Sequence, residues 1–503
     1  MDVPSIPESF KNKRIFITGG TGFLGKVLIE KILRSCPDFK VMYLLLREKK
    51  GKPIEERLEE IFQNEVTLDN DHCNLLFSLV KEKTPEVFEK VVAVSGDVTQ
   101  LQLGLNEPDK QLVLRSDIVF HVAASVRFDD HLTKATLMNT RGTREMIELM
   151  LQMPNLVVGV HVSTTYCNTD KDTIEEKVNR DHGDWREAIR LAENYNDEYK
   201  LACLTEKCLG GLKNTYLYTK HLAENIVEDY SDRLPLVLYR PGIVVSAWKE
   251  PIPGWIDNWN GPVGLTVAVG KGLLRVAYAN PKIILDYAPV DVVIKGLLVA
   301  TWNKLTKKGP QSNLPIYNCS ICDKVIKTQE EVYEIGMELY SKSPFKLLWY
   351  PSCTLTSSWI KFWLLFFSFN IIPGFILDSL LKITGRKPML MKILRKAYAA
   401  IMAVGLFSTR NWDFKSENFW HSLHNLLPED RNDFDYDMEK IDVYSFSWDA
   451  RIGSSRYLLK EPENPTEYKK YNRLKVLHYT LKYLFIGCIL YFVIAPRVQH
   501  LVY

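Results

Sequence analysis

The sequence has few of the residue patterns that proteins use to hold metal ions. Nine cysteines are scattered along 503 residues, and Cys319 and Cys322 form the one C-x2-C pair. Tetrahedral zinc needs four ligands, so a pair without a partner pair is interpreted as structural. His121, His161 and His221 show no H-x-E or H-x3-H spacing and are interpreted as structural residues or polar lining. We therefore expect no metal site, and the odd cysteine count suggests reduced thiols in a protein that faces the cytosol.

The chain also lacks an apolar segment near its start, internal repeats and a strong charge of either sign. Residues 1–13 are polar and contain two prolines, so we expect no secretory signal peptide in this segment. A net charge of +3 gives no indication of a nucleic-acid partner. The chain is 46% apolar and 25% charged, as globular proteins are, and its 503 residues exceed one ordinary core. We expect two domains, or one large domain with an appendage.

The first 300 residues contain an alternation of strand and helix patterns. Continuous apolar runs occupy residues 41–46, 91–94, 118–122, 157–162 and 236–239. Such runs are typical of strands that are buried on both faces of a sheet. Amphipathic helical patterns, such as residues 54–62 and 136–151, lie between them. This alternation predicts an α/β fold of the Rossmann type, a doubly wound parallel sheet with helices on both faces.

Residues 15–28 (IFITGGTGFLGKVL) carry the strongest functional pattern, a strand followed by a glycine turn and a helix. Gly19 permits the tight turn, Gly22 lets the backbone approach a pyrophosphate, and Gly25 lets the helix lie close on the sheet. The N–H groups and the positive dipole end of the helix then face the phosphates. The segment therefore predicts a bound dinucleotide.

The ends of the next strands indicate which dinucleotide binds. Arg47 ends the second strand, and Lys49 and Lys50 follow it. An arginine at this strand end accommodates the 2′-phosphate of NADP, whereas an acidic residue binds the free 2′-hydroxyl of NAD. Arg47 therefore predicts NADPH. Asp97, after the third strand, is placed to accept a hydrogen bond from the adenine amino group.

Small residues and a bend complete the expected cofactor site. Residues 122–125 (VAAS) leave room on the adenosine side, and residues 240–244 (RPGIV) can pack against the nicotinamide and offer backbone groups to its carboxamide. The expected cofactor-binding residues are Gly19, Thr21, Gly22, Phe23, Leu24, Gly25, Arg47, Asp97, Val98, Ala123, Tyr216, Lys220, Pro241 and Ile243.

Tyr216 and Lys220 are four residues apart in a helical pattern, so both side chains point to one face. A tyrosine hydroxyl, with an ordinary pKa of about 10, is a poor acid near neutrality, and a nearby ammonium lowers that pKa. We predict that Tyr216 protonates a carbonyl oxygen while a hydride reaches the carbon, and that Lys220 also bonds the nicotinamide ribose. Thr164, at the end of the fifth strand, is the expected third catalytic residue, with Ser163 and Thr165 as alternatives.

The C-terminal part contains two apolar segments. Residues 476–495 (VLHYTLKYLFIGCILYFVIA) have about the length that crosses a hydrocarbon core of roughly 30 Å. Basic residues precede this segment, so we expect a transmembrane tail anchor with the bulk of the protein in the cytosol. Because Lys482 lies inside it, a buried or interfacial helix is the alternative.

The second apolar segment, residues 359–377, is rich in aromatics and is broken by Pro373 and Gly374. Six Lys and Arg residues follow it within residues 382–396. We expect an interfacial or substrate-covering element rather than a second transmembrane helix, and a buried hairpin with a solvated basic face is the alternative. The acidic residues 427–442 are interpreted as a surface linker.

Together these motifs resemble the extended short-chain dehydrogenase/reductase superfamily, and more closely the eukaryotic alcohol-forming fatty acyl-CoA reductases. The matching segments are residues 18–38 (TGGTGFLGKVLIEKILRSCPD), 43–51 (YLLLREKKG), 121–129 (HVAASVRFD), 161–168 (HVSTTYCN), 214–224 (NTYLYTKHLAE) and 239–264 (YRPGIVVSAWKEPIPGWIDNWNGPVG). The resemblance is specific over residues 10–300 and looser over residues 350–450. It implies an NADPH-binding catalytic domain at 10–345, a smaller helical domain at 350–450 and a transmembrane tail at 474–496.

The resemblance also implies the reaction. NADPH would reduce a long-chain fatty acyl-CoA to a fatty alcohol through a hemithioacetal and an aldehyde, with release of CoA, an activity of lipid biosynthesis that supplies wax and ether lipid precursors. Tyr216, Lys220 and a Ser or Thr hydroxyl would catalyse it, and Thr164 is favoured because the family commonly has alanine where this chain has Thr165.

The resemblance also bears on the protein's location and leaves other activities open. It places the protein on a lipid membrane, of the endoplasmic reticulum or the peroxisome, facing the cytosol, with a homo-oligomer possible. The alternatives are an aldehyde-forming reductase, an extended family member acting on a sterol or nucleotide-sugar, and a scaffold without activity.

Overall fold

Two compact units make up the molecule, and each is built from several segments of the chain. The computed structural model describes residues 3–48, 51–63, 66–68, 71–73, 76–194, 205–309, 312–439, 441–462 and 465–502. Unit 1 comprises Met1–Asn258, Ile284–Ile326 and Asn411–Gly453, and unit 2 comprises Trp259–Ile283, Lys327–Arg410 and Ser454–Tyr503. The two units therefore interleave along the chain instead of following one another.

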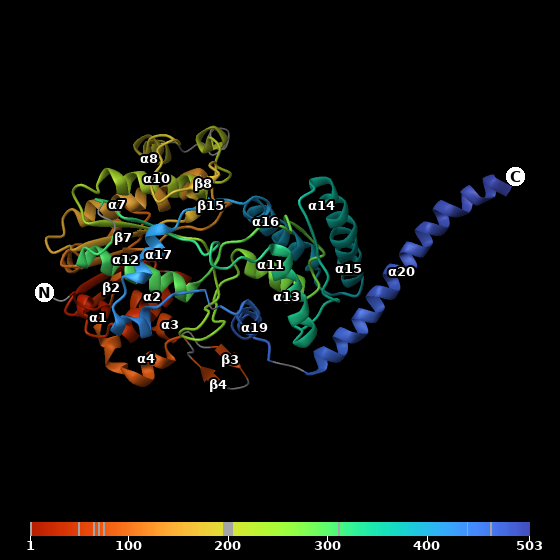
Figure 1. The fold of residues 1–503 in the computed structure, drawn as a ribbon, viewed down its shortest axis with the longest axis horizontal. Coiled ribbons are helices and arrows are strands. Elements are labelled where there is room, and N and C mark those ends of the chain that lie inside the picture. Colours follow the sequence, from red (N-terminus) through yellow and green to blue (C-terminus); the bar gives the residue numbers. More distant parts are fainter. Residues whose placement is uncertain are drawn as a thin grey trace. The chain divides into compact units, whose positions relative to one another are not determined.

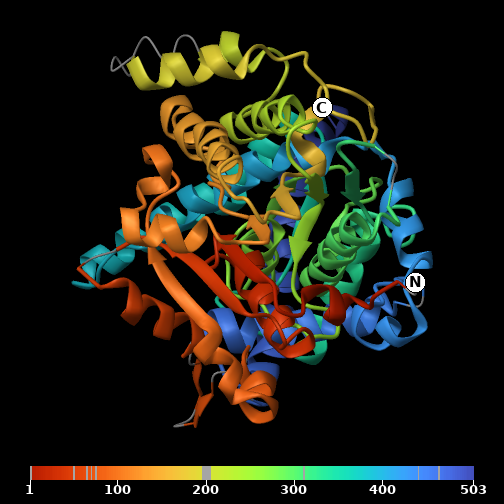
Figure 2. The same ribbon diagram turned by 90° about the vertical axis from the view of Figure 1, so that its left-hand side faces the viewer.

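Unit 1 contains a seven-stranded sheet whose strands all run parallel (Figures 1 and 2). Its spatial order is β13-β9-β7-β6-β1-β2-β5. The strands are β1 (Arg14–Thr18), β2 (Val41–Leu46), β5 (Val91–Ser95), β6 (Ile118–His121), β7 (Val158–Val162), β9 (Leu236–Pro241) and β13 (Ile316–Cys319). The doubly wound parallel sheet is thus confirmed, and the apolar runs form its strands; most of these strands are buried, whereas the edge strand β5 exposes Val92.

Helices cover the two faces of this sheet (Figures 1 and 2). One face carries α2 (Phe23–Ser35), α12 (Val290–Thr306) and α17 (Glu417–His424), and the other carries the π-helical turn η3 (Thr136–Arg141), α7 (Gly142–Met150) and α10 (Thr215–Asp229). The strand order reverses between β1 and β6, where Thr18 lies beside His121. In open α/β sheets, ligands bind above the carboxyl ends of the strands at this point.

Shorter elements complete unit 1. They are α1 (Ile6–Phe10), α3 (Ile54–Phe62), β3 (Val66–Leu68), β4 (Asp71–Cys73), α4 (Ser78–Lys83), η1 (Pro85–Lys90), η2 (Leu101–Gly104), α5 (Glu107–Val113), α6 (Leu132–Ala135), η4 (Thr165–Asn168), β8 (Thr173–Ile174), α8 (Trp185–Asn194), β10 (Ile243–Val245), β12 (Tyr287–Pro289), β15 (Asp413–Phe414), η6 (Pro428–Asp430), α18 (Arg431–Phe434) and α19 (Val443–Gly453). The amphipathic pattern at residues 54–62 coincides with α3.

The acidic segment 427–442 is an integral part of unit 1, so its interpretation as a surface linker was wrong. Phe434, Tyr436 and Met438 are buried, and the Tyr436 ring stacks on Phe419 of α17 with centroids 4.8 Å apart. Acidic and apolar residues alternate here, so an extended backbone directs the apolar side chains inward. The acidic composition concealed this alternation.

Unit 2 is mainly helical, as expected for the C-terminal region. Its elements are α11 (Pro262–Gly270), β11 (Val276–Tyr278), α13 (Gln329–Lys342), β14 (Thr354–Thr356), α14 (Trp359–Phe366), η5 (Phe367–Ile371), α15 (Ile372–Ile383), α16 (Leu390–Thr409), η7 (Ser454–Leu459) and α20 (Pro465–Val502). Leu274, Val276, Phe362, Phe366 and Ile401 form a core between the β11–β14 pair and the helices.

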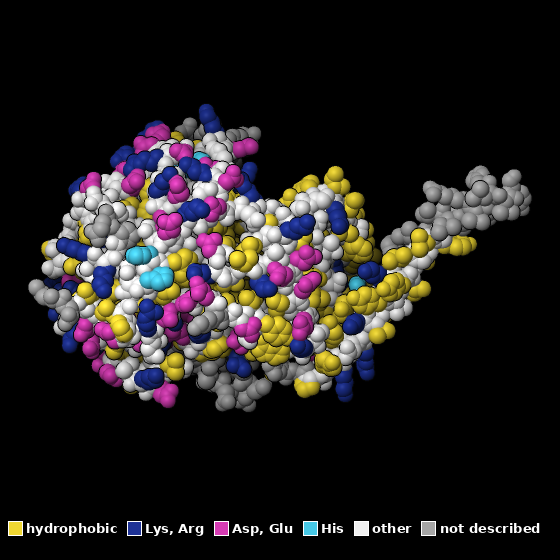
Figure 3. All heavy atoms as spheres, viewed as in Figure 1, with side chains coloured by type: hydrophobic (Ala, Val, Ile, Leu, Met, Phe, Trp, Pro, Cys, Tyr) yellow, Lys and Arg dark blue, Asp and Glu magenta, His cyan; other side chains and the backbone are white. Residues whose placement is uncertain are grey.

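One helix in the described part of the chain, Trp359–Ile383, is long and apolar enough to cross a membrane. Many of its apolar side chains are exposed, and Figure 3 shows them gathered on α14 and α15. Residues 476–495 fall within the single helix α20, and their role as a tail anchor stays a prediction.

Candidate active site

The glycine turn between β1 and α2 leaves no room for side chains at two of its glycines. Gly19 has a φ of +82°, and a Cβ there would lie 2.7 Å from the backbone nitrogen of Ala123. A Cβ on Gly25 would lie 2.2 Å from the Gly19 carbonyl oxygen. Gly22 precedes α2 and, within the described residues, no side chain caps this helix. Its first N–H groups are therefore available to an anion such as a phosphate.

The other expected residues of this turn differ in their surroundings. Thr21 is exposed, and Leu24 is half-buried at the start of α2. The Phe23 ring stacks on Trp255 with centroids 5.5 Å apart. The Ala123 backbone N–H donates to the Thr18 hydroxyl at 3.3 Å, which ties the end of β6 to the end of β1. These contacts fix the turn before any ligand binds.

Arg47 and Asp97 meet at the ends of β2 and β5. Arg47 Nη1 lies 3.5 Å from Asp97 Oδ2, and the Arg47 side chain is 57% exposed. Asp97 also accepts hydrogen bonds from the Thr99 backbone N–H and hydroxyl, at 2.9 and 2.8 Å. Val98 beside it is buried. The arginine is thus free to turn toward a phosphate, while Lys49 and Lys50 lie outside the described residues.

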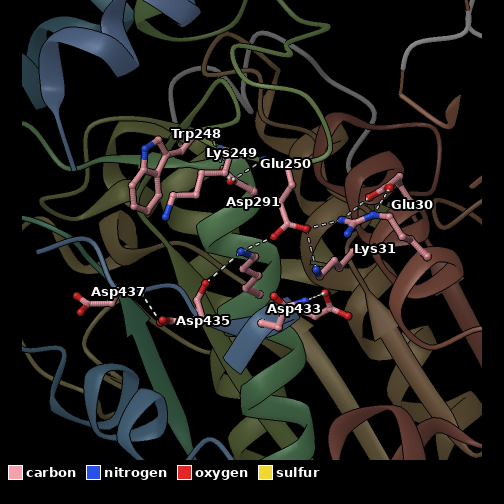
Figure 4. A network of polar contacts seen from close by, with 12 residues as sticks. Glu30, Lys31, Trp248, Lys249, Glu250, Asp291, Asp433, Asp435 and Asp437 are labelled. Carbon is pink, nitrogen blue, oxygen red and sulfur yellow. Dashed lines mark hydrogen bonds and ion pairs between the residues drawn. The ribbon is translucent and has the colours of Figure 1, made fainter. Parts of the chain in front are cut away.

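A buried ionic network holds α2 in place (Figure 4). Glu250 accepts a hydrogen bond from Lys31 Nζ at 2.7 Å and also pairs with Arg34 and Lys295. Asp291, at the start of α12, accepts from the backbone N–H groups of Trp248 and Lys249, both at 2.8 Å. The network therefore links α2 to the loop at 248–250 and to α12.

Replacing Glu250 with glutamine should lower the free energy of unfolding by about 3 kcal/mol at neutral pH. It should also make this free energy depend less on pH in the acidic range. Burial alone raises the pKa of Glu250, but the charges of Lys31, Lys295 and Arg34 outweigh it and lower the pKa to about 2. Because this pKa is depressed in the fold, the stabilisation is complete above about pH 4.5 and is lost as the pH falls toward 2. Urea unfolding of both proteins between pH 3 and 7 measures the difference.

The control for this prediction is Glu187→Gln, which removes an exposed carboxylate paired with Arg190 on α8. Exposed pairs contribute about 0–1 kcal/mol, so its unfolding should follow the parent protein at every pH. If the free energy of unfolding depended on pH equally in Glu250→Gln and in the parent protein, the prediction would be contradicted.

Thr164, Tyr216 and Lys220 come together at the carboxyl end of β7. The Tyr216 hydroxyl lies next to the Thr164 side chain, and Lys220 Nζ donates to the Val162 carbonyl oxygen at 2.7 Å. Tyr216 lies in the first turn of α10, which Asn214 caps by accepting from the Leu217 N–H at 2.9 Å. Burial lowers the pKa of Lys220 to about 8, and the nearby Glu224 carboxylate opposes this shift.

The pKa of Tyr216 shifts in the direction opposite to the expectation. Burial raises it above its ordinary value, and the nearby Cys167 adds to this, while the Thr164 side chain lowers it in part. Tyr216 therefore keeps its proton at neutral pH, as a proton donor to a carbonyl oxygen must.

The two alternative hydroxyls on this strand end face elsewhere. The Ser163 hydroxyl lies near the Glu224 carboxylate but has no hydrogen-bond partner among the described residues, and Thr165 Oγ1 donates to the Pro241 carbonyl oxygen at 3.4 Å. Thr164 is thus the one of the three whose hydroxyl meets Tyr216. This geometry favours Thr164 over the two alternatives, in line with the sequence-based choice.

A buried ion pair beneath Lys220 was missed by the sequence reasoning. Arg240 donates to Glu224 through Nε at 2.8 Å and through Nη2 at 2.7 Å, and both side chains are fully buried. Cys167 Sγ also lies 3.1 Å from the Glu224 carboxylate. The sequence feature that could have placed Glu224 near Lys220 is their spacing, since Glu224 follows Lys220 by one helical turn.

Asn139, on the π-helical turn η3, also escaped prediction. Its amide accepts from the Ser125 N–H at 2.8 Å and donates to the Thr219 hydroxyl at 3.0 Å, next to Lys220. It therefore joins α10 to the loop after β6. A single asparagine in a helical pattern carries no signal that could have indicated this role.

The bend at 240–244 offers fewer free backbone groups than expected. The Gly242 N–H donates to the Cys319 carbonyl oxygen at 3.1 Å, and the Ile243 N–H donates to the Asp286 carbonyl oxygen at 2.9 Å. Pro241 has no N–H, so no N–H of residues 241–243 is left for a carboxamide. The packing of Pro241 and Ile243 against a nicotinamide stays a prediction.

The histidines have structural surroundings. His121 lies between the Thr18 and Thr143 hydroxyls at 2.8 and 3.3 Å, and burial lowers its pKa to about 3. His161 is buried beside it, and His221 bonds Asn168 at 2.8 Å. In the parts of the chain that the structure describes, no group of three His, Cys, Asp or Glu side chains could hold a metal ion. Cys319 and Cys322 are free thiols.

Comparison with known proteins agrees with this architecture. The model of the male sterility protein family matches residues 17–297 with its NAD-binding part and residues 369–461 with a second part. The fold is similar to the reductase domain of a nonribosomal peptide synthetase from Mycobacterium tuberculosis, with a TM-score of 0.61, 16% identity and coverage of 91% of this chain and 94% of that one. Unit 1 thus contains a binding domain for a nicotinamide dinucleotide.

Two curated relatives match most of the chain. Human fatty acyl-CoA reductase 1 is 35% identical over 479 residues, which cover 94% of this chain and 90% of that protein. Fatty acyl-CoA reductase wat of Drosophila melanogaster is 34% identical over 475 residues, covering 94% and 89%. With this similarity along nearly its whole length, the chain belongs to the fatty acyl-CoA reductase family, whose model carries the description male sterility protein.

Proposed function

We propose that this enzyme uses NADPH to reduce long-chain fatty acyl-CoA to fatty alcohol and free CoA, through a hemithioacetal and an aldehyde. The observation that carries the proposal is the contact between Tyr216 and Thr164, with Lys220 one turn along α10, above the sheet of a fatty acyl-CoA reductase. The names of the relatives also favour an acyl-CoA over a sterol or nucleotide-sugar.

The residues at the glycine turn fit the proposed cofactor. Gly22 leaves the N-terminus of α2 uncapped among the described side chains, and Arg47 carries an exposed guanidinium at the end of β2. The α2 N–H groups would hold the pyrophosphate, and Arg47 would hold the 2′-phosphate. When bound, NADPH would supply the hydride for each reduction.

The catalytic residues would handle the oxygen of the substrate. Tyr216 and Thr164 would donate hydrogen bonds to the acyl carbonyl oxygen, and the Tyr216 proton would pass to that oxygen as the carbon accepts a hydride. The hemithioacetal then loses CoA as a thiol, which leaves an aldehyde. A second hydride and a second proton convert the aldehyde to the alcohol. Lys220, with its positive charge below about pH 8, would stabilise the Tyr216 phenolate that remains after the proton has passed to the substrate.

Incubating the full chain with palmitoyl-CoA and NADPH tests this reaction. We expect two NADPH oxidised and one CoA thiol released for each hexadecanol formed. Persistent hexadecanal with one NADPH consumed would favour the aldehyde-forming alternative, and no NADPH oxidation with acyl-CoAs of any length would contradict the proposal.

Replacing Arg47 with alanine should weaken NADPH binding by about 10- to 100-fold and leave NADH binding nearly unchanged. A charged hydrogen bond to a phosphate contributes about 1.5–3 kcal/mol, and NADH has no phosphate at this position. Titration of both dinucleotides measures the ratio. Arg190→Ala, which removes an exposed cation from α8, is the matched control. An unchanged preference in Arg47→Ala would remove Arg47 from the proposed site.

A further inference from the structure

Unit 2 carries an exposed apolar surface formed by the helix Trp359–Ile383. We define the apolar surface as its outward side chains that are at least 38% exposed: Trp359, Ile360, Trp363, Leu364, Phe367, Phe369, Ile372, Phe375, Ile376, Leu377, Leu380 and Ile383. Figure 3 shows apolar side chains over α14 and α15. Contiguous apolar patches of this kind mark interaction sites.

The opposite side of the same helix is fixed to unit 2 along its whole length. Its buried positions are Phe362, Phe366, Asn370, Gly374 and Asp378, which recur every four residues. An α-helix has 3.6 residues per turn, so a four-residue repeat drifts around it, and the wider π-helical turn η5 counteracts the drift. One continuous stripe therefore faces the unit.

Polar contacts strengthen this attachment. Asn370 Nδ2 donates to the Leu273 carbonyl oxygen at 2.9 Å. The Asp378 carboxylate accepts from the backbone N–H groups of Met389, Leu390 and Met391, each at 2.9 Å, at the start of α16. A Cβ on Gly374 would lie 2.6 Å from Leu394 of α16, so α15 and α16 approach closely.

The charges around the apolar surface have one sign. Between residues 359 and 410 the sequence has eight Lys and Arg residues, and Asp378 is the one acidic residue. Asp378 is buried, whereas the basic residues are exposed: Lys361, Lys382, Arg386, Lys387, Lys392, Arg395, Lys396 and Arg410. Apolar and aromatic side chains flanked by exposed cations fit a bilayer interface with anionic headgroups.

We infer that the apolar surface docks in the plane of one leaflet of an anionic membrane, with the basic residues on its headgroups. A transmembrane position of the helix Trp359–Ile383 is disfavoured, because α16 packs beside α15. The helix would then carry Lys392, Arg395 and Lys396 of α16 into the hydrocarbon. Docking of this surface on a second copy of the chain is disfavoured, because it would bring the basic residues of the two copies close together. This contact is separate from the predicted tail anchor and from the proposed reaction.

Lipid photocrosslinking of the full chain, added to preformed vesicles, tests this inference. The vesicles contain phosphatidylcholine with or without three-tenths phosphatidylserine, and a phospholipid with a diazirine in its acyl chain is placed in the outer leaflet. Mass spectrometry locates the adducts. We expect adducts on the outward positions of residues 359–383, at least tenfold more with phosphatidylserine, and a loss of most of this gain in 0.5 M salt.

Matched variants separate this surface from the rest of the chain. Leu364→Glu with Phe375→Glu should reduce adducts on residues 359–383 at least tenfold and leave adducts on α20 unchanged. The control, Leu101→Glu with Ile326→Glu, changes two exposed apolar side chains of unit 1 and should leave all adducts unchanged. All four positions are exposed, so the fold should tolerate them.

Three outcomes would overturn the inference, all without reference to catalysis. The first is adducts confined to α20. The second is labelling of residues 359–383 by a probe placed in the inner leaflet alone, which would indicate a transmembrane helix. The third is protection of these residues from lipid together with chain-to-chain crosslinks, which would indicate a second copy.

Discussion

Replacing Tyr216 with phenylalanine should lower the turnover of acyl-CoA reduction by a factor of about 10² to 10⁴, the usual contribution of a positioned general acid. The change removes the hydroxyl that meets Thr164 and keeps the ring, which packs against Phe128 with centroids 5.6 Å apart. Substrate binding should change less, so the loss should appear in kcat more than in KM. Steady-state NADPH oxidation with palmitoyl-CoA measures both constants.

The matched control is Tyr230→Phe, which removes a hydroxyl from the other end of the same helix. The Tyr230 hydroxyl donates to Glu148 at 2.9 Å. With a rise of about 1.5 Å per residue, Tyr230 lies about 21 Å along the helix from Tyr216. Its activity should equal that of the parent enzyme. If Tyr216→Phe kept more than a tenth of the parent turnover, another group would have to supply the proton.

Replacing Glu224 with alanine should destabilise the fold by about 3–5 kcal/mol, because it leaves the Arg240 guanidinium buried without a counter-charge. Both side chains are inaccessible to solvent, and two hydrogen bonds join them. Glu228→Ala, one turn further along α10, removes one of the two carboxylates that pair with Arg180 at the surface and should cost at most about 1 kcal/mol. Urea unfolding at pH 7 compares the two variants.

Glu224 should also affect the chemistry through Lys220. Its carboxylate raises the pKa of Lys220, which burial lowers to about 8. In Glu224→Gln this support is lost, so Lys220 should lose its proton at a lower pH and the alkaline limb of kcat/KM should move to lower pH. If the alkaline limb of kcat/KM lay at the same pH in the variant and the parent, the role of Glu224 would be structural alone.

The parallel sheet and the glycine turn were predictable because local patterns encode them. The apolar runs are long enough to identify strands buried on both faces, and Gly19 and Gly25 stand where a Cβ would collide with backbone atoms. The spacing of Tyr216 and Lys220 likewise placed both residues on α10. Each of these signals depends on residues within one helix, strand or turn.

The surroundings of the site were not predictable in the same way. Burial raises the pKa of Tyr216, although the spacing alone suggested that Lys220 would lower it. The partners of Glu224 and Glu250 come from segments 16 or more residues away, so their ion pairs leave no local pattern. The interpretation of residues 427–442 as a surface linker was wrong because it followed their acidic composition and overlooked the alternation of acidic and apolar residues.

The sequence by itself determined the sheet, the glycine turn and the helical spacing of Tyr216 and Lys220, because periodicity and glycine stereochemistry act over a few neighbouring residues. Only the tertiary structure decided that Thr164 is the hydroxyl that meets Tyr216, that Arg47 reaches Asp97, and that two units interleave along the chain. These features depend on which distant segments share a surface, and that is settled when the whole chain buries its apolar area at once.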